Sequence, residues 1–422
     1  MTMNRRALMA TGAGLGLAGM AAGEVIAGPR SAPALGAGAF VDLDHNSEHP
    51  QTAKIQAAID AAASAGVPVM LPPGRFVSGP LFLRKGTKLI GAHGATTLVA
   101  LLSEPVIQAT NVSDILISGL VIDGANVATE ALHLEGASGS IRDCVIQRVR
   151  DAGVHCNDCA RLSITHNEVS ACGNNGIQVW RSNPGPDGTQ VVGNRIFDIR
   201  ADAGGSGENG NGINVFRAGD VMVSGNRIED CAYSAVRGNA ASNFQVLGNS
   251  CARLGEVAIY AEFGFEGAVI AQNVIDGAAT GIAVTNFNEG GRLAVVQGNL
   301  VRNLKRRLHE PVDKRGDGIT VEADTCVSDN VIEGAENIGL SIGWGPYMRD
   351  VVATGNIVRG AEIGIAISSD QTAGACLVAN NMISGAKSGA IRGMDHGKLV
   401  GGELVDRETK TARVRIVGNM AV

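Results

Sequence analysis

Aromatic residues are scarce in this sequence, where two Trp, three Tyr and nine Phe make up 3% of 422 residues. Charged residues are also sparse, at 18%, and the formal net charge is −6. This acidic balance argues against nucleic acid as a partner, because nucleic-acid-binding proteins carry a basic surface. It leaves an anionic glycan open as a ligand, since a local basic patch can override the average charge. The 58 glycines indicate many short turns around a core of small aliphatic side chains.

No N-terminal run is apolar enough for a membrane span, which needs roughly 20 consecutive apolar residues. Instead, Arg5 and Arg6 precede a weakly apolar run rich in Gly and Ala, with small residues near Ala27. This pattern is typical of a twin-arginine export signal. We therefore predict a signal peptide over residues 1–27 and a linker over 28–50. We also predict export in the folded state through the twin-arginine translocase, a periplasmic or secreted location, and no membrane span after cleavage.

What the sequence has in abundance is a repeat, with most steps between roughly 21 and 27 residues. Each copy holds an Asn, an apolar residue two positions later, a short polar turn, and a Gly or Ala that begins an alternating strand. This period predicts stacked β-coils, each of which contacts only its neighbours. The Asn recurs at Asn167, Asn194, Asn226, Asn249, Asn273, Asn299, Asn330, Asn356 and Asn381. The Gly or Ala recurs at Gly153, Gly176, Gly212, Ala235, Ala258, Gly281, Gly318, Gly339, Gly364 and Gly389.

The block before the repeats predicts an amphipathic helix that ends at Gly66, followed by a strand and a tight turn over 71–76. Its apolar residues at helical spacing are Ile55, Ala58, Ile59 and Ala62. This block resembles the N-terminal cap of pectin-lyase-like right-handed parallel β-helix proteins. With the twin-arginine start and the repeats, the whole chain resembles a family of twin-arginine-translocated repeat proteins of that superfamily. The resemblance implies a fold and export, and it names no reaction.

We therefore predict an all-β fold, a right-handed single-stranded parallel β-helix of about 10–12 coils with an N-terminal capping helix. Residues 51–105 would form the cap and first coils, 106–400 the repeats, and 401–422 a C-terminal cap. The recurring Asn residues are interpreted as an internal ladder of stacked amides rather than as a site.

Cysteine pairing is not favoured by the spacing of the eight cysteines. Cys172 and Cys231 take the same place two repeats apart, on the order of 10 Å, which is too far for a bridge. Cys156 and Cys159 form a CxxC motif with no second pair to complete a zinc site. Buried free thiols are the favoured interpretation, and a Cys156–Cys159 bridge is the alternative.

Strand alternation assigns two outward rows to the coils. The first row is His133, His155, Gln178, Asn214, Arg237, Tyr260, Ala283, Thr320 and Ser341. The second row is Glu135, Asn157, Trp180, Phe216, Asn239, Glu262, Thr285, Glu322 and Gly343. A solvated sheet face is polar in any case, but His, Arg, Tyr, Trp and Phe in these rows and Trp344 and Tyr347 in the turns suit sugar rings.

Two coils carry long insertions, one over 201–211 and a basic one over 303–317. Both enter the same strand from the same side, four coils apart, so their roots are about 19 Å apart. We predict that they bracket a trough wide enough for several sugars, since long loops on a rigid scaffold concentrate function. Neutral insertions in a tolerant repeat fold are the alternative.

A trough on an exported β-helix suggests β-elimination from an acidic polysaccharide, which needs a cation for the uronate, a base and an acid. The predicted catalytic residues are Arg237, Tyr260, Glu262 and Asn214. The predicted substrate-binding residues are His133, His155, Gln178, Trp180, Phe216, Glu208, Lys305, Arg306, Arg307, His309, Lys314 and Arg315.

Hydrolysis would need two carboxylates, for which Glu262 with Glu208 is a weak pair, so elimination is favoured. His133 and His155 are too far from Arg237 to share its reacting centre and form an adjacent pair of their own. No metal is assigned there, and a metal site at this pair is the less favoured alternative. No cofactor is predicted, and calcium is left open without a motif to support it. We predict an exported protein that binds and, as a lyase, cleaves a uronate-containing polysaccharide. The alternative is a non-catalytic glycan-binding or cell-envelope structural repeat protein.

Overall fold

The computed structural model describes residues 39–46, 48–205, 207–307, 316–405 and 413–422. The predicted signal peptide and most of the predicted linker lie outside these residues, as do His309, Lys314 and Arg315. Within the described ranges, no helix is both long and apolar enough to cross a membrane.

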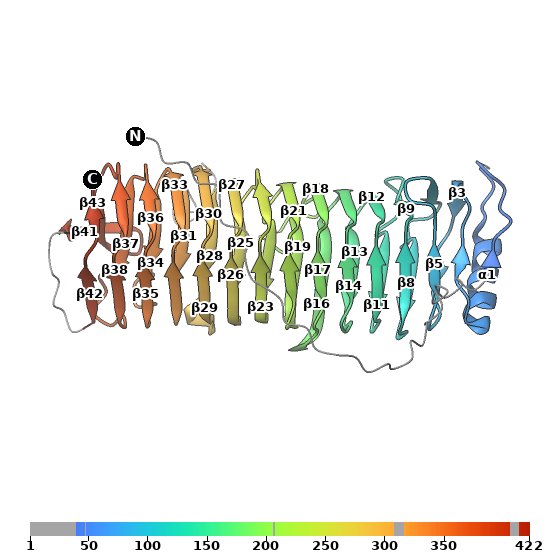
Figure 1. The fold of residues 1–422 in the computed structure, drawn as a ribbon, viewed down its shortest axis with the longest axis horizontal. Coiled ribbons are helices and arrows are strands. Elements are labelled where there is room, and N and C mark those ends of the chain that lie inside the picture. Colours follow the sequence, from blue (N-terminus) through green and yellow to red (C-terminus); the bar gives the residue numbers. More distant parts are fainter. Residues whose placement is uncertain (1–38, 47, 206, 308–315, 406–412) are drawn as a thin grey trace, which may run out of the picture. The chain divides into compact units, whose positions relative to one another are not determined.

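The described residues form a right-handed parallel β-helix of about 12 turns, as predicted. Coils stack side by side in a row, with helix α1 (Thr52–Ala65) at one end (Figure 1). A typical coil has three strands, which we call lead, middle and closing in chain order. Lead and middle strands belong to a 29-stranded sheet, and closing strands form a 14-stranded sheet.

The strands have the following bounds. The lead strands are β4 (Leu81–Phe82), β7 (Ile107–Thr110), β10 (Leu132–Glu135), β13 (Ala152–Asn157), β16 (Asn175–Pro186), β19 (Asn211–Gly219), β22 (Val236–Asn239), β25 (Val257–Glu262), β28 (Thr280–Val284), β31 (Asp317–Val321), β34 (Ile338–Ile342), β37 (Ile363–Ser368) and β40 (Ile391–Asp395). The middle strands are β2 (Val69–Met70), β5 (Lys88–Ile90), β8 (Ile115–Ser118), β11 (Gly139–Arg142), β14 (Ser163–Thr165), β17 (Gln190–Val192), β20 (Met222–Ser224), β23 (Ser242–Leu247), β26 (Glu266–Ala271), β29 (Arg292–Gln297), β32 (Thr325–Ser328), β35 (Val351–Thr354), β38 (Cys376–Ala379) and β42 (Val414–Val417). The closing strands are β3 (Gly74–Ser78), β6 (Thr96–Ala100), β9 (Val121–Asp123), β12 (Val145–Val149), β15 (Glu168–Cys172), β18 (Arg195–Ile199), β21 (Arg227–Cys231), β24 (Ser250–Ala252), β27 (Val274–Ala278), β30 (Leu300–Leu304), β33 (Val331–Ala335), β36 (Ile357–Arg359), β39 (Met382–Ser384) and β43 (Met420–Ala421).

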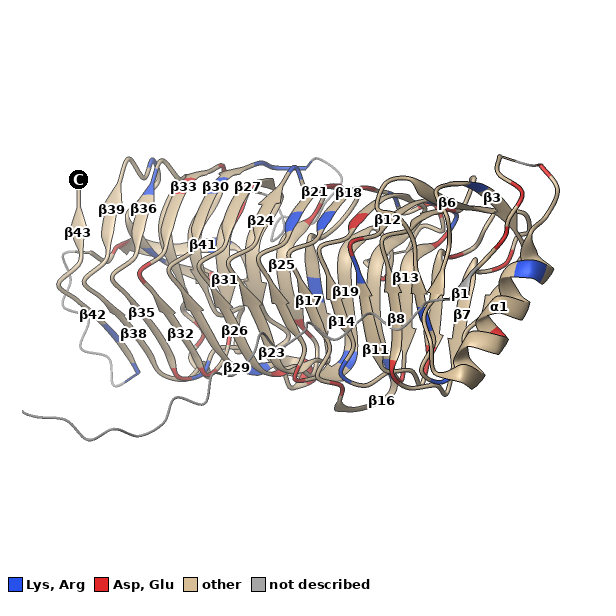
Figure 2. Ribbon diagram, turned by 45° about the vertical axis from the view of Figure 1, so that its right-hand side comes forward, with Lys and Arg blue, Asp and Glu red and all other residues tan. Residues whose placement is uncertain are grey.

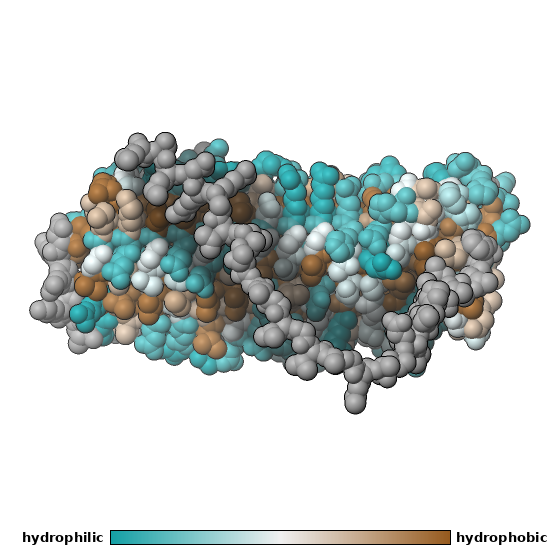
Figure 3. Space-filling model, viewed as in Figure 1, coloured by the Kyte–Doolittle hydropathy of each residue, from teal (hydrophilic) through white to brown (hydrophobic). Residues whose placement is uncertain are grey.

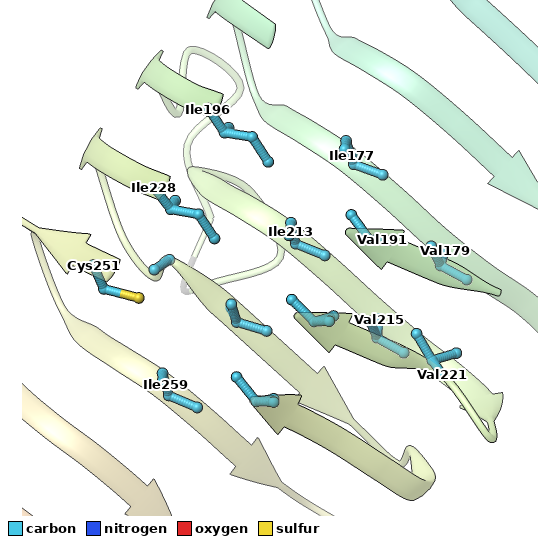
Figure 4. Close-up of a cluster of buried hydrophobic side chains, with 14 of the residues drawn as sticks. Ile177, Val179, Val191, Ile196, Ile213, Val215, Val221, Ile228, Cys251 and Ile259 are labelled. Carbon is cyan, nitrogen blue, oxygen red and sulfur yellow. The ribbon is translucent and has the colours of Figure 1, made fainter. Parts of the chain in front are cut away.

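The core is a set of aliphatic columns that run from coil to coil. Three fully buried isoleucines line one column of the lead strands: Ile177 in β16, Ile213 in β19 and, two coils further, Ile259 in β25. Ile196 and Ile228 stack in the closing strands (Figure 4). Identical positions meet because the pairing is parallel and in register. Small and branched side chains therefore fill the interior without aromatic residues in most coils, which explains the low aromatic content.

The Asn ladder predicted from the repeat is confirmed. The Asn273 side-chain amide donates to Val246 O (2.9 Å) and to Asn299 Oδ1 (3.0 Å). Its own Oδ1 accepts from the backbone N–H (2.9 Å) and side-chain amide (3.0 Å) of Asn249. The same pattern runs from Asn167 to Asn381 and continues to Asn419. The ladder satisfies buried backbone groups at every corner between a middle and a closing strand.

The two ends differ from the middle of the stack. Helix α1 buries Ile55, Ile59 and Ala62, and Gly66 ends it in the left-handed conformation at φ 69°. Within the predicted linker, β1 (Ala39–Phe40) pairs with β2. At the other end, β42 and β43 pair with β38 and β39 within the stretch 401–422, for which a C-terminal cap is predicted. β41 (Lys398–Glu403) pairs with β40 in the antiparallel sense.

All eight cysteines are free, and seven are buried. Cys156 and Cys159 are not bridged, in agreement with the favoured interpretation. Cys326 is the exception to the predicted burial, because its side chain points outward from β32. Burial raises the pKa of the Cys172 and Cys251 thiols to about 12.

Charged residues lie along the turns between strands and in several closing strands (Figure 2). Apolar surface is visible toward the C-terminal end of the stack (Figure 3), and Val269, Val295 and Ile357 are among the exposed aliphatic side chains.

Candidate functional site

The register places both predicted outward rows as the sequence indicated. His133 pairs with His155, His155 with Gln178, Gln178 with Asn214, Asn214 with Arg237, and Arg237 with Tyr260. Two positions further along each strand, Trp180 pairs with Phe216, Phe216 with Asn239, and Asn239 with Glu262. Each row is therefore a line of neighbours about 4.8 Å apart along the lead strands.

The middle of the first row is covered and not open, contrary to the predicted trough. Asn214 and Arg237 are only 4% and 7% exposed. The segment between β18 and β19 lies over them, because Glu208 O accepts from the Asn214 amide (2.9 Å) and a Cβ added at Gly207 would overlap the Arg237 guanidinium. The two long insertions do share one corner, since they join β18 to β19 and β30 to β31. The first insertion covers the row that it was expected to border.

Arg237 is at the centre of a buried ionic cluster. Its Nε donates to Glu262 Oε1 (2.6 Å), and its Nη1 lies 3.8 Å from Glu256 Oε2. The Asn239 amide also donates to Glu262 Oε1 (3.1 Å), and the guanidinium lies 5.4 Å from the centre of the Tyr260 ring. The guanidinium therefore interacts with two carboxylates, and the cluster holds it in place.

Burial raises the pKa of Glu262, although the Arg237 charge works in the opposite direction. Burial also raises the pKa of Tyr260 well above its usual value, and the Glu262 charge adds to this effect. The Tyr260 phenol is protonated at neutral pH, as an unperturbed tyrosine is, and the raised pKa makes it a weaker acid.

A pocket of about 290 Å³ opens beside this cluster, from Tyr260 to the β40–β41 hairpin. Trp344 and Tyr347 from the turn after β34 form one wall, and the His396 ring meets Trp344 edge-on at 5.5 Å. The polar lining includes Thr285, Asn286, Asn288, Asp317, Thr320, Glu322, Asn337 and Ser341.

The carboxylates of this pocket are held by hydrogen bonds. Asp317 Oδ1 accepts from the Asn337 amide (2.8 Å) and from the Ile338 N–H (3.1 Å). Glu322 Oε2 accepts from the Phe287 N–H (2.7 Å). These hydrogen bonds hold the Asp317 and Glu322 carboxylates in fixed positions in the pocket wall.

Among the described residues of the predicted basic loop, Arg306 contacts the pocket lining. Its guanidinium donates to Asn337 Oδ1 (3.0 Å), and Asn337 lines the pocket. The Lys305 N–H donates to Ala278 O (2.9 Å), and Arg307 lies beside Gly255. The first insertion contributes Glu208 through its carbonyl oxygen, which also accepts from the Asn175 amide (3.1 Å).

The N-terminal half of the rows holds a second cluster. His133 and His155 rings are 5.0 Å apart, His155 and Trp180 5.3 Å, and Trp180 and Phe216 6.1 Å, all edge to face. Glu130 bridges the histidines, with Oε2 2.6 Å from His133 Nδ1 and Oε1 2.7 Å from His155 Nδ1.

The Glu130 carboxylate is stabilised by this arrangement. Burial opposes its ionisation, but the hydrogen bonds with the two imidazoles outweigh it and lower its pKa to about 2. The hydrogen bond with Glu130 raises the pKa of His133.

Sequence reasoning missed three features. Glu130 lies three positions before His133, and that spacing was the available signal. Trp344 and Tyr347 were recognised as aromatic turn residues, but the turn that brings them against His396 has no repeat position from which to infer it. Glu256, which lies beside Arg237, was not singled out because it precedes its strand in the turn before β25.

Comparison with known proteins agrees with the class that these coils define, a right-handed parallel β-helix. The family described as "Right handed beta helix region" matches residues 103–196 and 130–301. The match supports the predicted right-handed β-helix fold, and twin-arginine translocation stays a prediction. No curated protein sequence matches the chain.

Several solved structures share the fold. The catalytic unit of the GH87 α-1,3-glucanase from Streptomyces thermodiastaticus strain HF3-3 is similar with a TM-score of 0.56 at 14% identity, over 93% of this chain and 69% of that one. The N-terminal fragment of bacteriophage Phi29 gene product 12 gives 0.58 at 14%, over 87% and 69%. PfbA, a surface adhesin of Streptococcus pneumoniae, gives 0.54 at 15%, over 84% and 91%. At these identities the similarity shows the fold alone.

Proposed function

We propose that the protein is an exported polysaccharide-binding β-helix protein whose glycan occupies the pocket between Tyr260 and Trp344. The observation that carries this proposal is the combination of aromatic faces with amide, hydroxyl and carboxylate groups in one pocket on an outward row. Sugar rings offer apolar faces and a rim of hydroxyls, so they need both kinds of partner. A glucanase and an adhesin among the solved proteins with this fold lend support.

The pocket size fits part of a chain. Ligand pockets commonly hold about 300–1,000 Å³, and this one holds about 290 Å³. One or two sugar residues would fill it, and the rest of the polysaccharide would extend along the lead strands. The aromatic and histidine cluster at Trp180 and Phe216 would supply a further contact surface on the same rows.

The proposed glycan is acidic, with uronate residues. Support comes from Arg306, which places a cation at the pocket rim, and from the basic sequence that continues after it. The acidic net charge of the whole chain would then be locally overridden at this rim. Twin-arginine export and a periplasmic or secreted location, which the N-terminal sequence predicts, would place the protein where such polymers occur.

The enzymatic candidate is β-elimination. A base would remove the proton next to the uronate carboxylate, and an acid would protonate the leaving oxygen. Tyr260 belongs to the predicted catalytic set and lines the pocket, so its position, although not its raised pKa, suits the second role. Hydrolysis is less well supported, because Asp317 and Glu322 are engaged by backbone N–H donors.

The test is a glycan screen on the signal-free protein that includes alginate and pectate, followed by calorimetry and an assay for unsaturated products. Trp344→Ala should weaken binding at least tenfold, or about 1.4 kcal/mol, because buried aromatic anchors dominate binding energy. Phe82→Ala removes an exposed aromatic of β4 and is the matched control. Tyr260→Phe should keep binding and lose unsaturated product.

Two results would contradict the proposal. If no polysaccharide in the screen binds, the glycan-binding function is wrong. If Phe82→Ala and Trp344→Ala weaken binding equally, the pocket is not the binding site. Binding without unsaturated product would support the non-catalytic alternative.

A further inference from the structure

We propose that Glu130, His133 and His155 form a binding site for a zinc-like divalent transition-metal ion. The three residues can each offer one ligand atom, and these atoms lie within 4.8 Å of one another. The cluster lies three rungs from Arg237 along the first row, so it is separate from the pocket assigned to the glycan. The proposal goes beyond glycan binding and does not depend on it.

The fold brings these ligands together without help from a mobile segment. His133 in β10 and His155 in β13 occupy paired positions, so their side chains leave the sheet side by side. Glu130 lies in the turn before β10, where its backbone accepts a bond from the Val106 N–H (3.1 Å). The carboxylate is 6% exposed and is directed at both imidazoles.

To hold a small tetrahedral ion, the ligand atoms of this cluster must move apart. Zinc binds imidazole nitrogen and carboxylate oxygen at about 2.0–2.2 Å, which separates its ligand atoms by roughly 3.4 Å. The two Nδ1–carboxylate distances are now 2.6 and 2.7 Å. Metal binding would therefore replace the two hydrogen bonds to Glu130, with rotation of the imidazole side chains, which are 30% and 18% exposed.

The donor set selects the kind of metal. Two imidazole nitrogens and one carboxylate are typical of zinc and similar ions, and an open fourth position is the arrangement of catalytic zinc sites. Calcium and magnesium prefer oxygen ligands in larger or fully octahedral shells, which this cluster does not supply. One rung along, the buried Gln178 Oε1 has no hydrogen-bond partner among the described residues, so a further polar group stands beside the cluster.

The experiment uses untagged full-length protein that has been dialysed against a chelator. Calorimetry with ZnCl₂, and separately with CaCl₂, measures stoichiometry and affinity, and CoCl₂ reports geometry by its visible absorption. The variants are Glu130→Gln, His133→Gln and His155→Gln, which keep hydrogen-bonding capacity at each position. His166→Gln alters an exposed histidine of the same coil region and is the control. Circular dichroism confirms that each variant folds.

We expect one zinc ion per chain, no calcium binding, and at least a tenfold loss of zinc affinity in each of the three ligand variants. His166→Gln should bind zinc as the unaltered protein does. The proposal is overturned if the unaltered protein binds no stoichiometric zinc, or if folded His133→Gln and His155→Gln retain full affinity. Calcium binding in preference to zinc would overturn it equally.

Discussion

Replacing Asn273 by Ala would remove one amide from the middle of the ladder. The change deletes four hydrogen bonds: two that the Asn273 amide donates, to Val246 O and Asn299 Oδ1, and two that its Oδ1 accepts from Asn249. The Asn249 side chain keeps its bond to Val223 O (3.0 Å). The Asn249 backbone N–H, however, loses its acceptor, Asn273 Oδ1.

The cost follows from what stays buried. An unsatisfied buried donor costs about 1–3 kcal/mol, and a hydrogen bond lost without leaving an orphan costs about 1 kcal/mol. One orphaned N–H and partial losses at Val246 and Asn299 give a destabilisation of about 3 kcal/mol. Asn419 should tolerate the same change better, at about 1 kcal/mol, because it is only partly buried and water can replace its bonds.

Urea unfolding followed by circular dichroism measures the loss, with Asn288→Ala as the control. Asn288 is exposed and bonds Glu289 at 3.3 Å, so its change should stay within about 0.5 kcal/mol. Because repeat arrays can unfold in parts, hydrogen exchange at the Asn249 amide gives a local readout and should be faster. The ladder argument is refuted if Asn273→Ala costs no more than Asn288→Ala and the Asn249 amide stays protected.

Two further predictions concern titratable groups. Ellman's reagent should modify one thiol per native chain, at the exposed Cys326, because burial keeps thiols such as Cys172 and Cys251 protonated. Cys326→Ser should abolish this reaction. Reaction of several native thiols would contradict the buried assignment. Burial raises the folded-state pKa of Glu262, so the free energy of unfolding should fall as pH rises from the unfolded pKa of about 4.5 through the higher folded value. Glu262→Gln should make that decline smaller, as measured by chemical denaturation at a series of pH values. An unchanged decline would show that the protonation of Glu262 is not linked to folding.

The repeat made the fold predictable from sequence, and the register of the outward rows with it. A period of one coil places His133 beside His155 and Arg237 beside Tyr260 without any knowledge of packing, because parallel in-register pairing aligns equal positions. Alternation then says which side chains leave the core, and the structure agrees.

The repeat period does not predict the conformation of segments that depart from the repeat. The insertion containing Gly207 and Glu208 was expected beside the trough, but it lies over Asn214 and Arg237. The hairpin that brings His396 to Trp344 likewise has no counterpart in other coils. The candidate pocket depends on such segments, and their course is set by tertiary contacts, which single-sequence patterns do not encode.

The direction of the Asn ladder has an electrical consequence. Each amide donates toward the next coil, from Asn167 to Asn194 and onward to Asn419, so the side-chain dipoles all point the same way. Aligned dipoles polarise one another, and each bond in the middle of such a chain gains from those on both sides. The Asn side chains therefore form a polarised column of hydrogen-bonded amides inside an apolar core. Replacing Asn273 would divide this column into two shorter ones, and the hydrogen bonds would weaken even in coils that do not contact the altered residue.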